Sequence, residues 1–204
     1  NKGTVQFELG LAVQPELPLF AAIGDLSKER GGDLIADIAP RILRNEAQLV
    51  VLGSPGEAAT HLEKLASEMP ERFCLRTTHT EKERHLALAA ADFLLLPARS
   101  PHEVDLALCA LRYGALPIVR PVGALADTIV DIDAKLETGN GFVAETDSAD
   151  EVLACVQRAL TAYGQTKAFG ELRARAMRTD TSWERAARRY EHAYKKQQRS
   201  SDAA

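Results

Sequence analysis

Short apolar segments alternate with longer amphipathic segments along almost the whole chain. Each apolar segment has the length of a strand and ends at a turn, a glycine or a proline. Strands that are apolar on both faces are typical of a parallel sheet covered by helices on both sides. Because the crossovers between such strands are right-handed, the pattern predicts an α/β fold with a doubly wound, Rossmann-like parallel sheet. The expected strands are residues 19–23, 48–52, 73–77, 93–96, 116–119 and 142–143.

Helical periodicity fills the intervals between these strands. Thr80, with Glu83 three residues later, forms the capping-box pattern of a helix start. Ser148 and Ser182 are expected to cap two later helices. The expected helices are residues 33–44, 57–69, 81–90, 104–113, 125–129, 149–163, 169–178 and 183–196.

The composition is that of an ordinary globular chain, with 46% hydrophobic and 26% charged residues among 204. We expect one domain over residues 1–196 and a polar tail over 197–204. The net charge of −4 argues against a nucleic-acid partner, because such proteins usually carry a basic face. No apolar stretch approaches the ~20 residues of a membrane span. The chain has no signal peptide and opens without methionine, so we expect it to be cut from a longer protein.

Three cysteines, Cys74, Cys109 and Cys155, lie far apart in apolar segments. No cysteine or histidine cluster has the spacing of metal ligands, so no metal site is expected. The interpretation is that all three are reduced core residues of a cytoplasmic protein. No cofactor is indicated by any motif.

The loops that follow the strands are the places to look for a ligand, because doubly wound sheets bind at the carboxyl ends of their strands. Residues 24–32 hold glycines and two cations, including Arg30, which suits a diphosphate; the alternative is a solvated turn. Residues 53–56 begin with Gly53, which could let a ligand approach the backbone; the alternative is a simple strand-to-helix turn.

Two further loops carry candidate side chains. His79 could stack on a base, although a solvated loop histidine is the plainer interpretation. Arg99, His102 and Glu103 offer a cation, an imidazole and a carboxylate, but they do not define a reaction, and no catalytic residue is identified. The basic final helix, with Trp183, is interpreted as a solvated face with aromatic rings packed inward.

Several stretches, in order, resemble the C-terminal domain of bacterial glycogen synthases and plant starch synthases. The most specific block is ALRYG at 110–114, PIVR at 117–120 and GALADT at 123–128. Residues 1–2, 9–11, 48–54, 139–142 and 182–184 extend the resemblance over nearly the whole chain.

The resemblance implies half of a retaining glucosyltransferase with two Rossmann domains, which uses ADP-glucose or UDP-glucose. It implies that Arg30 neutralises phosphate, Gly53 permits close approach, His79 stacks on the base and Arg99 supports the sugar loop. The α-glucan acceptor would bind an N-terminal domain that this chain lacks.

Several positions depart from the family pattern. Asp25 stands where the family has an arginine in its phosphate loop, and Arg30 stands where it has a lysine. The sugar-contacting glutamate falls on Pro101, a flexible glycine on Val104 and a threonine on Leu106. A carboxylate near a diphosphate opposes binding by on the order of several kcal/mol at ~4 Å.

Two hypotheses follow, and the sequence leaves catalytic activity open between them. In one, the chain is the nucleotide-sugar half of a glucosyltransferase. In the other, it is a non-catalytic pseudo-glycosyltransferase module for scaffolding, regulation or carbohydrate association.

Overall fold

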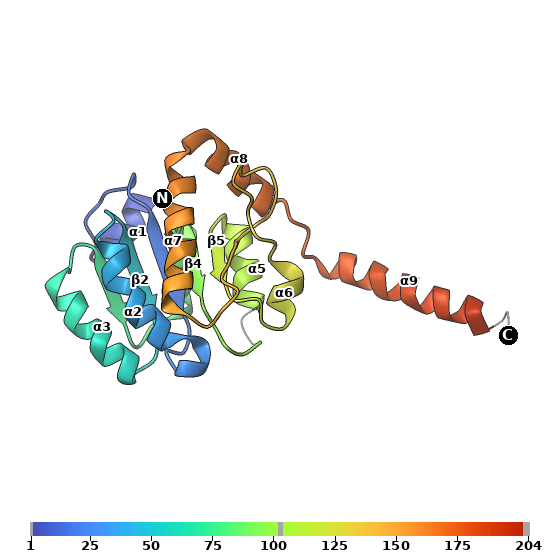
Figure 1. Cartoon of the computed structure of the whole chain (residues 1–204), viewed down its shortest axis with the longest axis horizontal. Coiled ribbons are helices and arrows are strands. Elements are labelled where there is room, and N and C mark those ends of the chain that lie inside the picture. Colours follow the sequence, from blue (N-terminus) through green and yellow to red (C-terminus); the bar gives the residue numbers. More distant parts are fainter. Residues whose placement is uncertain (1, 102–103, 202–204) are drawn as a thin grey trace.

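The protein is built on one six-stranded sheet whose strands are all parallel (Figure 1). The computed structural model describes residues 2–101 and 104–201, with side chains as far as residue 195. The strand order is β3-β2-β1-β4-β5-β6, which confirms the doubly wound, Rossmann-like α/β fold. The strands are β1 (Leu19–Ile23), β2 (Gln48–Leu52), β3 (Phe73–Arg76), β4 (Phe93–Leu96), β5 (Leu116–Val119) and β6 (Phe142–Val143).

The central strands β1, β2, β4 and β5 are buried at every residue, as their apolar sequences require. In the register of the sheet, Phe20 of β1 pairs with Phe93 of β4. The two rings stack with centroids 4.9 Å apart, and Phe142 approaches Phe93 at 6.1 Å in an edge arrangement. Aromatic packing therefore joins the middle of the sheet to its β6 edge.

Helices cover both faces of the sheet. On one face α2 packs against α3 and α7, and on the other α4 packs against α1 and α5 (Figure 1). The helices are α1 (Lys2–Glu8), η1 (Lys28–Arg30), α2 (Gly32–Leu43), α3 (Glu57–Glu68), α4 (Glu81–Ala90), α5 (Val104–Tyr113), α6 (Ala124–Thr128), α7 (Ala149–Gly164), α8 (Thr166–Met177) and α9 (Trp183–Ser201). Among the described residues, no helix is long and apolar enough to cross a membrane.

The predicted capping box at the start of α4 is confirmed. Thr80 Oγ1 accepts a hydrogen bond from the Glu83 N–H at 3.2 Å, and the Thr80 N–H donates to the Glu83 carboxylate at 2.7 Å. Ser148 occupies the predicted N-cap position of α7, but its side chain makes no capping hydrogen bond. In that turn the Glu151 carboxylate accepts hydrogen bonds from the backbone N–H groups of residues 145 and 146 instead.

Two short helices, α1 and η1, are not predicted by the sequence pattern. The seven residues of α1 are too few to be stable alone, so packing must hold them. The buried Gln6 amide donates to Gln48 at the start of β2 over 2.6 Å, and Val5 joins the core. Tertiary contacts with residues distant in sequence therefore determine this helix.

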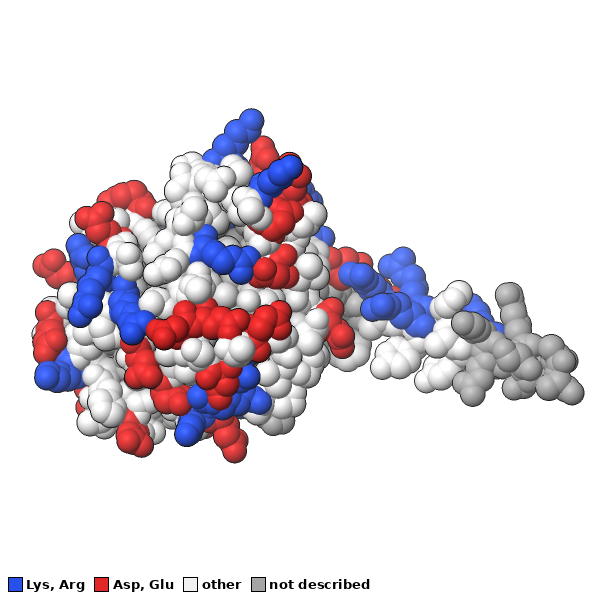
Figure 2. Space-filling model, in the orientation of Figure 1, with Lys and Arg blue, Asp and Glu red and all other residues white. Residues whose placement is uncertain are grey.

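Helix α9 projects away from the body of the protein (Figure 1). It continues to Ser201, past the end expected near Lys196, and the Ser182 hydroxyl caps its start by accepting from the Arg185 N–H at 3.3 Å. The aromatic rings expected to pack inward are exposed instead, Trp183 at 87% and Tyr190 at 64%. Lys and Arg side chains gather over the same helix (Figure 2). The boundary at residues 196–197 between domain and tail stays a prediction.

A buried carboxylate at the start of β4 ties together segments from both ends of the chain. Asp92 is 2% exposed and lies between Lys2 at 2.5 Å and Arg173 at 3.2 Å. It also accepts the N–H of Leu19, the first residue of β1, at 2.9 Å. Because a buried charge is stable only when it is paired, these partners are needed together.

Replacing this carboxylate by a neutral amide should weaken the whole fold. Asp92→Asn should lower the free energy of unfolding by about 3 kcal/mol, since it leaves two partly buried cations without a counter-charge. The exposed Asp127→Asn on α6 is the control and should change stability by less than about 0.5 kcal/mol. Urea unfolding measures both, and equal values for the two variants would contradict a structural role for Asp92.

Candidate functional site

The order of the strands reverses between β1 and β4, which are neighbours in the sheet. In doubly wound sheets the crevice beyond the carboxyl ends of two such strands is the usual ligand site. Here the described segments at this point are residues 24–32 after β1 and residues 97–101 after β4. Both are among the loops that the sequence pattern selects.

Side-chain contacts fix the first half of the β1 loop. The Asp25 carboxylate accepts the Ser27 N–H at 2.7 Å and the Ser54 hydroxyl at 3.0 Å. The same Ser54 oxygen accepts the Leu26 N–H at 3.2 Å. A Cβ added to Gly53 would lie 2.5 Å from the Leu26 side chain. Gly53 is therefore needed so that Leu26 can pack; its predicted contact with a ligand stays a prediction.

The second half of the loop turns sharply into α2 through two glycines. Gly31 has a φ of +76°, which favours glycine, and an added Cβ would lie 2.4 Å from the carbonyl oxygen of Pro97. At Gly32 an added Cβ would lie 1.9 Å from the carbonyl oxygen of Leu26. These glycines let the loop after β1 pack directly on the segment after β4.

Arg99 joins these two loops. Its backbone N–H donates to the carbonyl oxygen of Glu29 at 2.7 Å, and its guanidinium donates to the carbonyl oxygen of Lys28. The guanidinium also donates hydrogen bonds to both carboxylate oxygens of Asp33, at 2.7 and 3.0 Å. Asp147, after β6, accepts from Arg99 Nε at 2.7 Å. Four of the five guanidinium N–H groups are thus engaged by described residues.

Asp33 lies in the first turn of α2, where a helix attracts an anion. Partial burial raises the pKa of Asp33, but Arg99 and the backbone N–H groups of residues 33 and 34 outweigh that effect, so the pKa is lowered. The hydrogen bond to Asp33 in turn raises the pKa of Arg99. A carboxylate of the protein therefore takes up the helix start and the guanidinium, two groups that would otherwise attract phosphate.

Arg120, which the sequence analysis did not select as a site residue, extends the network. Its guanidinium lies 3.8 Å from Asp147, and it donates to the carbonyl oxygens of Thr146 at 3.3 Å and Ala98 at 3.5 Å. Nothing in the sequence pattern pairs these residues, since they come from three different loops. The network holds the loops after β1, β4, β5 and β6 together at one edge of the sheet.

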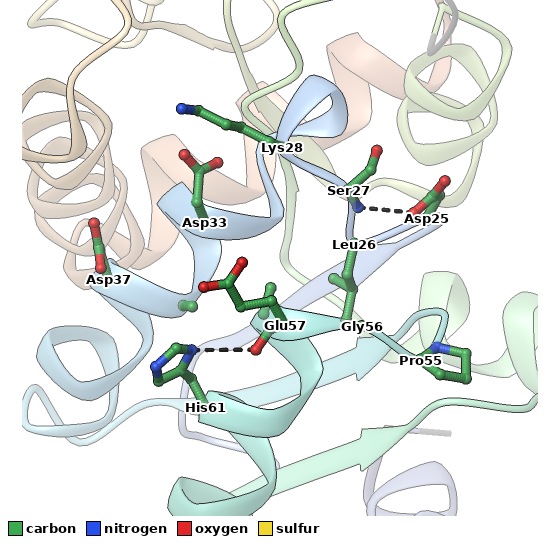
Figure 3. A pocket seen from close by; sticks show the side chains of 12 residues that line it. Asp25, Leu26, Ser27, Lys28, Asp33, Asp37, Pro55, Gly56, Glu57 and His61 are labelled. Carbon is green, nitrogen blue, oxygen red and sulfur yellow. Dashed lines mark hydrogen bonds between the residues drawn. The ribbon is translucent and has the colours of Figure 1, made fainter.

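A pocket of about 590 Å³ opens beside this edge, between the first turns of α2 and α3 (Figure 3). Four of its lining side chains are carboxylates, from Asp25, Asp33, Asp37 and Glu57. Lys28 is the one lysine or arginine among the residues that line it. This excess of negative charge disfavours binding of a diphosphate, so we do not assign the predicted phosphate contact to this pocket.

The remaining predicted site residues lie apart from this pocket. Arg30, at the end of η1, borders a narrow cavity next to Gly24 and Asp25. His79 lies just before α4, and its Nδ1 atom is buried without a hydrogen-bond partner among the described residues. His102 and Glu103, the candidate imidazole and carboxylate, lie outside the described residues. Residues 2–101 and 104–201 hold no cluster of histidine, cysteine or acidic side chains suited to a metal.

Curated relatives match nearly the whole chain. A glycogen synthase of Anaeromyxobacter dehalogenans is 38% identical over 197 residues, which are 95% of this chain and 41% of that protein. Glycogen synthase 2 of Geobacter metallireducens is 35% identical over 196 residues, 96% of this chain and 40% of that protein. The chain is a homologue of part of the bacterial glycogen synthases. It spans about two fifths of their length, and no protein-family model matches it.

Solved structures agree with this homology. The catalytic domain of starch synthase IV from Arabidopsis thaliana, bound to ADP and acarbose, has a TM-score of 0.82 at 26% identity, over 96% of this chain and 41% of that one. The C-terminal domain of a group 1 glycosyl transferase from Francisella tularensis has a TM-score of 0.65 at 16% identity. It covers 87% of this chain and 88% of that one, and shows the fold alone.

The arginine network of this glycogen synthase homologue should stabilise its fold measurably. Arg99→Lys keeps the charge but loses the two-pronged grip on Asp33, so the free energy of unfolding should fall by about 1.5 kcal/mol. Arg41→Lys, which alters one exposed ion pair with Asp150, should change it by less than about 0.5 kcal/mol. Urea unfolding checks both, and equal effects would mean that the Arg99 contacts do not stabilise the loops.

The lowered pKa of Asp33 gives a pH dependence of definite sign. A carboxyl with a depressed folded-state pKa stabilises the fold above its unfolded value of 3.8, and this stabilisation is lost as the pH falls through the folded-state value. The stability difference between wild type and Asp33→Asn should therefore shrink below pH 3.8. Asp37→Asn, whose carboxylate makes no ion pair or hydrogen bond with a described residue, is the control. If the stability difference between wild type and Asp33→Asn stayed constant as the pH fell below 3.8, the stabilising effect of the ionised Asp33 would be refuted.

Proposed function

We propose that this chain is the part of a glycogen or starch synthase-like glucosyltransferase that binds the nucleotide sugar, ADP-glucose or UDP-glucose. The observation that carries the proposal is its 38% identity to a glycogen synthase over 95% of its length. The starch synthase with TM-score 0.82, which was solved with ADP, supports a nucleotide ligand. The convergence of loops beyond β1 and β4 supports a site at that edge of the sheet.

In this proposal two of the four predicted residues contact the nucleotide sugar, and the other two hold the surrounding loops in place. Arg30 neutralises phosphate from the end of η1, and His79 stacks on the base. Gly53 allows the Leu26 side chain, and with it the β1 loop, to lie close to the nucleotide. Arg99 supports the sugar loop; three of its N–H groups hold η1 and α2, and a fourth donates to Asp147 after β6. Transfer of glucose to an α-glucan would need the remainder of the parent protein.

A second candidate function is a non-catalytic pseudo-glycosyltransferase module. The structure favours it at one point: the carboxylates of Asp25 and Asp33 lie at the loop and helix start that would face the diphosphate. Carboxylates at these positions would weaken the electrostatic stabilisation of the diphosphate, which is usually the largest contribution to catalysis in an active transferase. We further propose a reducing, cytoplasmic location, which the buried and unpaired Cys74 and Cys155 support.

Calorimetric titration with ADP, UDP, ADP-glucose and UDP-glucose separates the two functions. The nucleotide-sugar proposal expects one nucleotide sugar to bind between micromolar and low millimolar Kd. Arg30→Ala should weaken that binding about tenfold, because a hydrogen-bonded charge is lost from the phosphate. Arg178→Ala, an exposed arginine at the end of α8, is the control and should bind like wild type.

The opposite result is equally definite. No heat and no thermal shift with any of the four ligands would favour the pseudo-glycosyltransferase module. In the intact parent protein, failure to incorporate glucose from both ADP-glucose and UDP-glucose would rule out the enzymatic function, whatever the isolated chain binds.

A further inference from the structure

A second large pocket lies at the β6 side of the sheet, on the later turns of α7. Its volume is about 690 Å³, within the size range of small-molecule sites. Helix α7 begins near the carboxyl-edge loops and ends toward the opposite edge, where Tyr163 donates to the carbonyl oxygen of Glu16 before β1. The pocket is lined by the second half of α7 and by residues 131–136, so it shares no residue with the site at the switch point.

The charged groups of this pocket, two carboxylates and one guanidinium, are all engaged within the protein. Arg158 of α7 pairs with Asp131 at 2.8 Å, and Asp131 also accepts the Val143 N–H at 2.8 Å. The Asp133 carboxylate accepts three backbone N–H groups, from residues 135, 137 and 138, at 2.9 to 3.1 Å. A ligand that enters the pocket therefore meets charges already satisfied by the protein, which favours an uncharged molecule.

Neutral polar side chains line the helical wall. Gln157, Thr161 and Gln165 recur at every fourth residue of α7 or its C-cap, about 6 Å apart along the axis. The amides of Gln157 and Gln165 make no side-chain hydrogen bond to a described residue. Thr161 donates to the Gln157 carbonyl at 2.9 Å and keeps its lone pairs. This row presents repeated donors and acceptors in one line, as a chain of hydroxyl-bearing units would require.

The facing wall is strained and held in place. Leu136 is 6% exposed and has a φ of +60°, a left-handed conformation that a non-glycine residue adopts only at an energetic cost. Arg175 holds this turn by donating to the carbonyl oxygens of Leu136 and Gly139, each at 3.2 Å. Beneath the pocket, Ile132 and Phe142 belong to the core at 2% and 1% exposure, and the Arg158 guanidinium lies over the Phe142 ring. The pocket is thus formed in advance, and its neutral polar rim is the surface that a ligand would meet.

We propose that this pocket binds a neutral oligosaccharide chain at a second site, separate from the nucleotide. The hydroxyl groups of sugar rings can pair with the amides of Gln157 and Gln165, and an uncharged chain does not compete with the ion pair and backbone hydrogen bonds that already engage the charged groups. A row of side chains over two turns of α7 fits several linked units better than one small molecule. The choice of an α-glucan as probe rests on the proposed function, whereas the preference for a neutral hydroxylated ligand does not.

Nuclear magnetic resonance titration of the chain with maltoheptaose tests the site directly. Backbone amide signals of residues 131–139 and 154–165 should shift and saturate, with a Kd on the order of 1 mM. Ala154→Trp, which fills the pocket from an exposed position of α7, should weaken binding at least about tenfold. Ala187→Trp, at an exposed position of α9, is the matched control and should bind like wild type.

A second variant pair tests the polar rim. Thr161→Ala should weaken binding a few-fold, whereas Thr60→Ala on α3, whose hydroxyl makes the same kind of bond to a carbonyl four residues earlier, should have no effect. No saturable shift at these amides, or full affinity in Ala154→Trp, would overturn the site. ADP added to the same sample should shift the loops after β1, β2, β3 and β4 but not residues 131–139, so failure of the nucleotide proposal and failure of this one are read from different signals.

Discussion

The paired, buried carboxylate of Asp92 is the interaction on which the rest of the structure depends. It holds the amino ends of β1 and β4 side by side, and these are the two strands between which the sheet reverses its order. Lys2 and Arg173 bring α1 and α8 to the same point. The switch point at the opposite ends of these strands is therefore held by a buried ionic cluster at the other edge of the sheet.

At the carboxyl edge a second ionic network has the opposite consequence. Arg99 and Asp33 make the loops rigid, but they also use groups that could have bound phosphate. The pair therefore keeps the shape of the site while it leaves fewer groups to bind a phosphate.

The sequence was sufficient wherever neighbouring residues determine structure. The strands are apolar throughout, and Thr80 and its partner lie within one turn, so both could be predicted. It failed where partners are distant: Gln6 and Gln48 are 42 positions apart, and Arg99 and Asp33 are 66 apart. Four candidate site residues could be chosen from the loops and the resemblance, but the engagement of Arg99 within the protein could not.

The exposed helix α9 also determines how the protein can be observed. Trp183 is the one tryptophan in the sequence, and it is 87% exposed at the start of that helix. Its fluorescence therefore senses the surroundings of α9 rather than the packing of the sheet. An emission spectrum typical of water would accompany a fully folded core, and a shift to shorter wavelength would mark the moment at which another surface covers the helix.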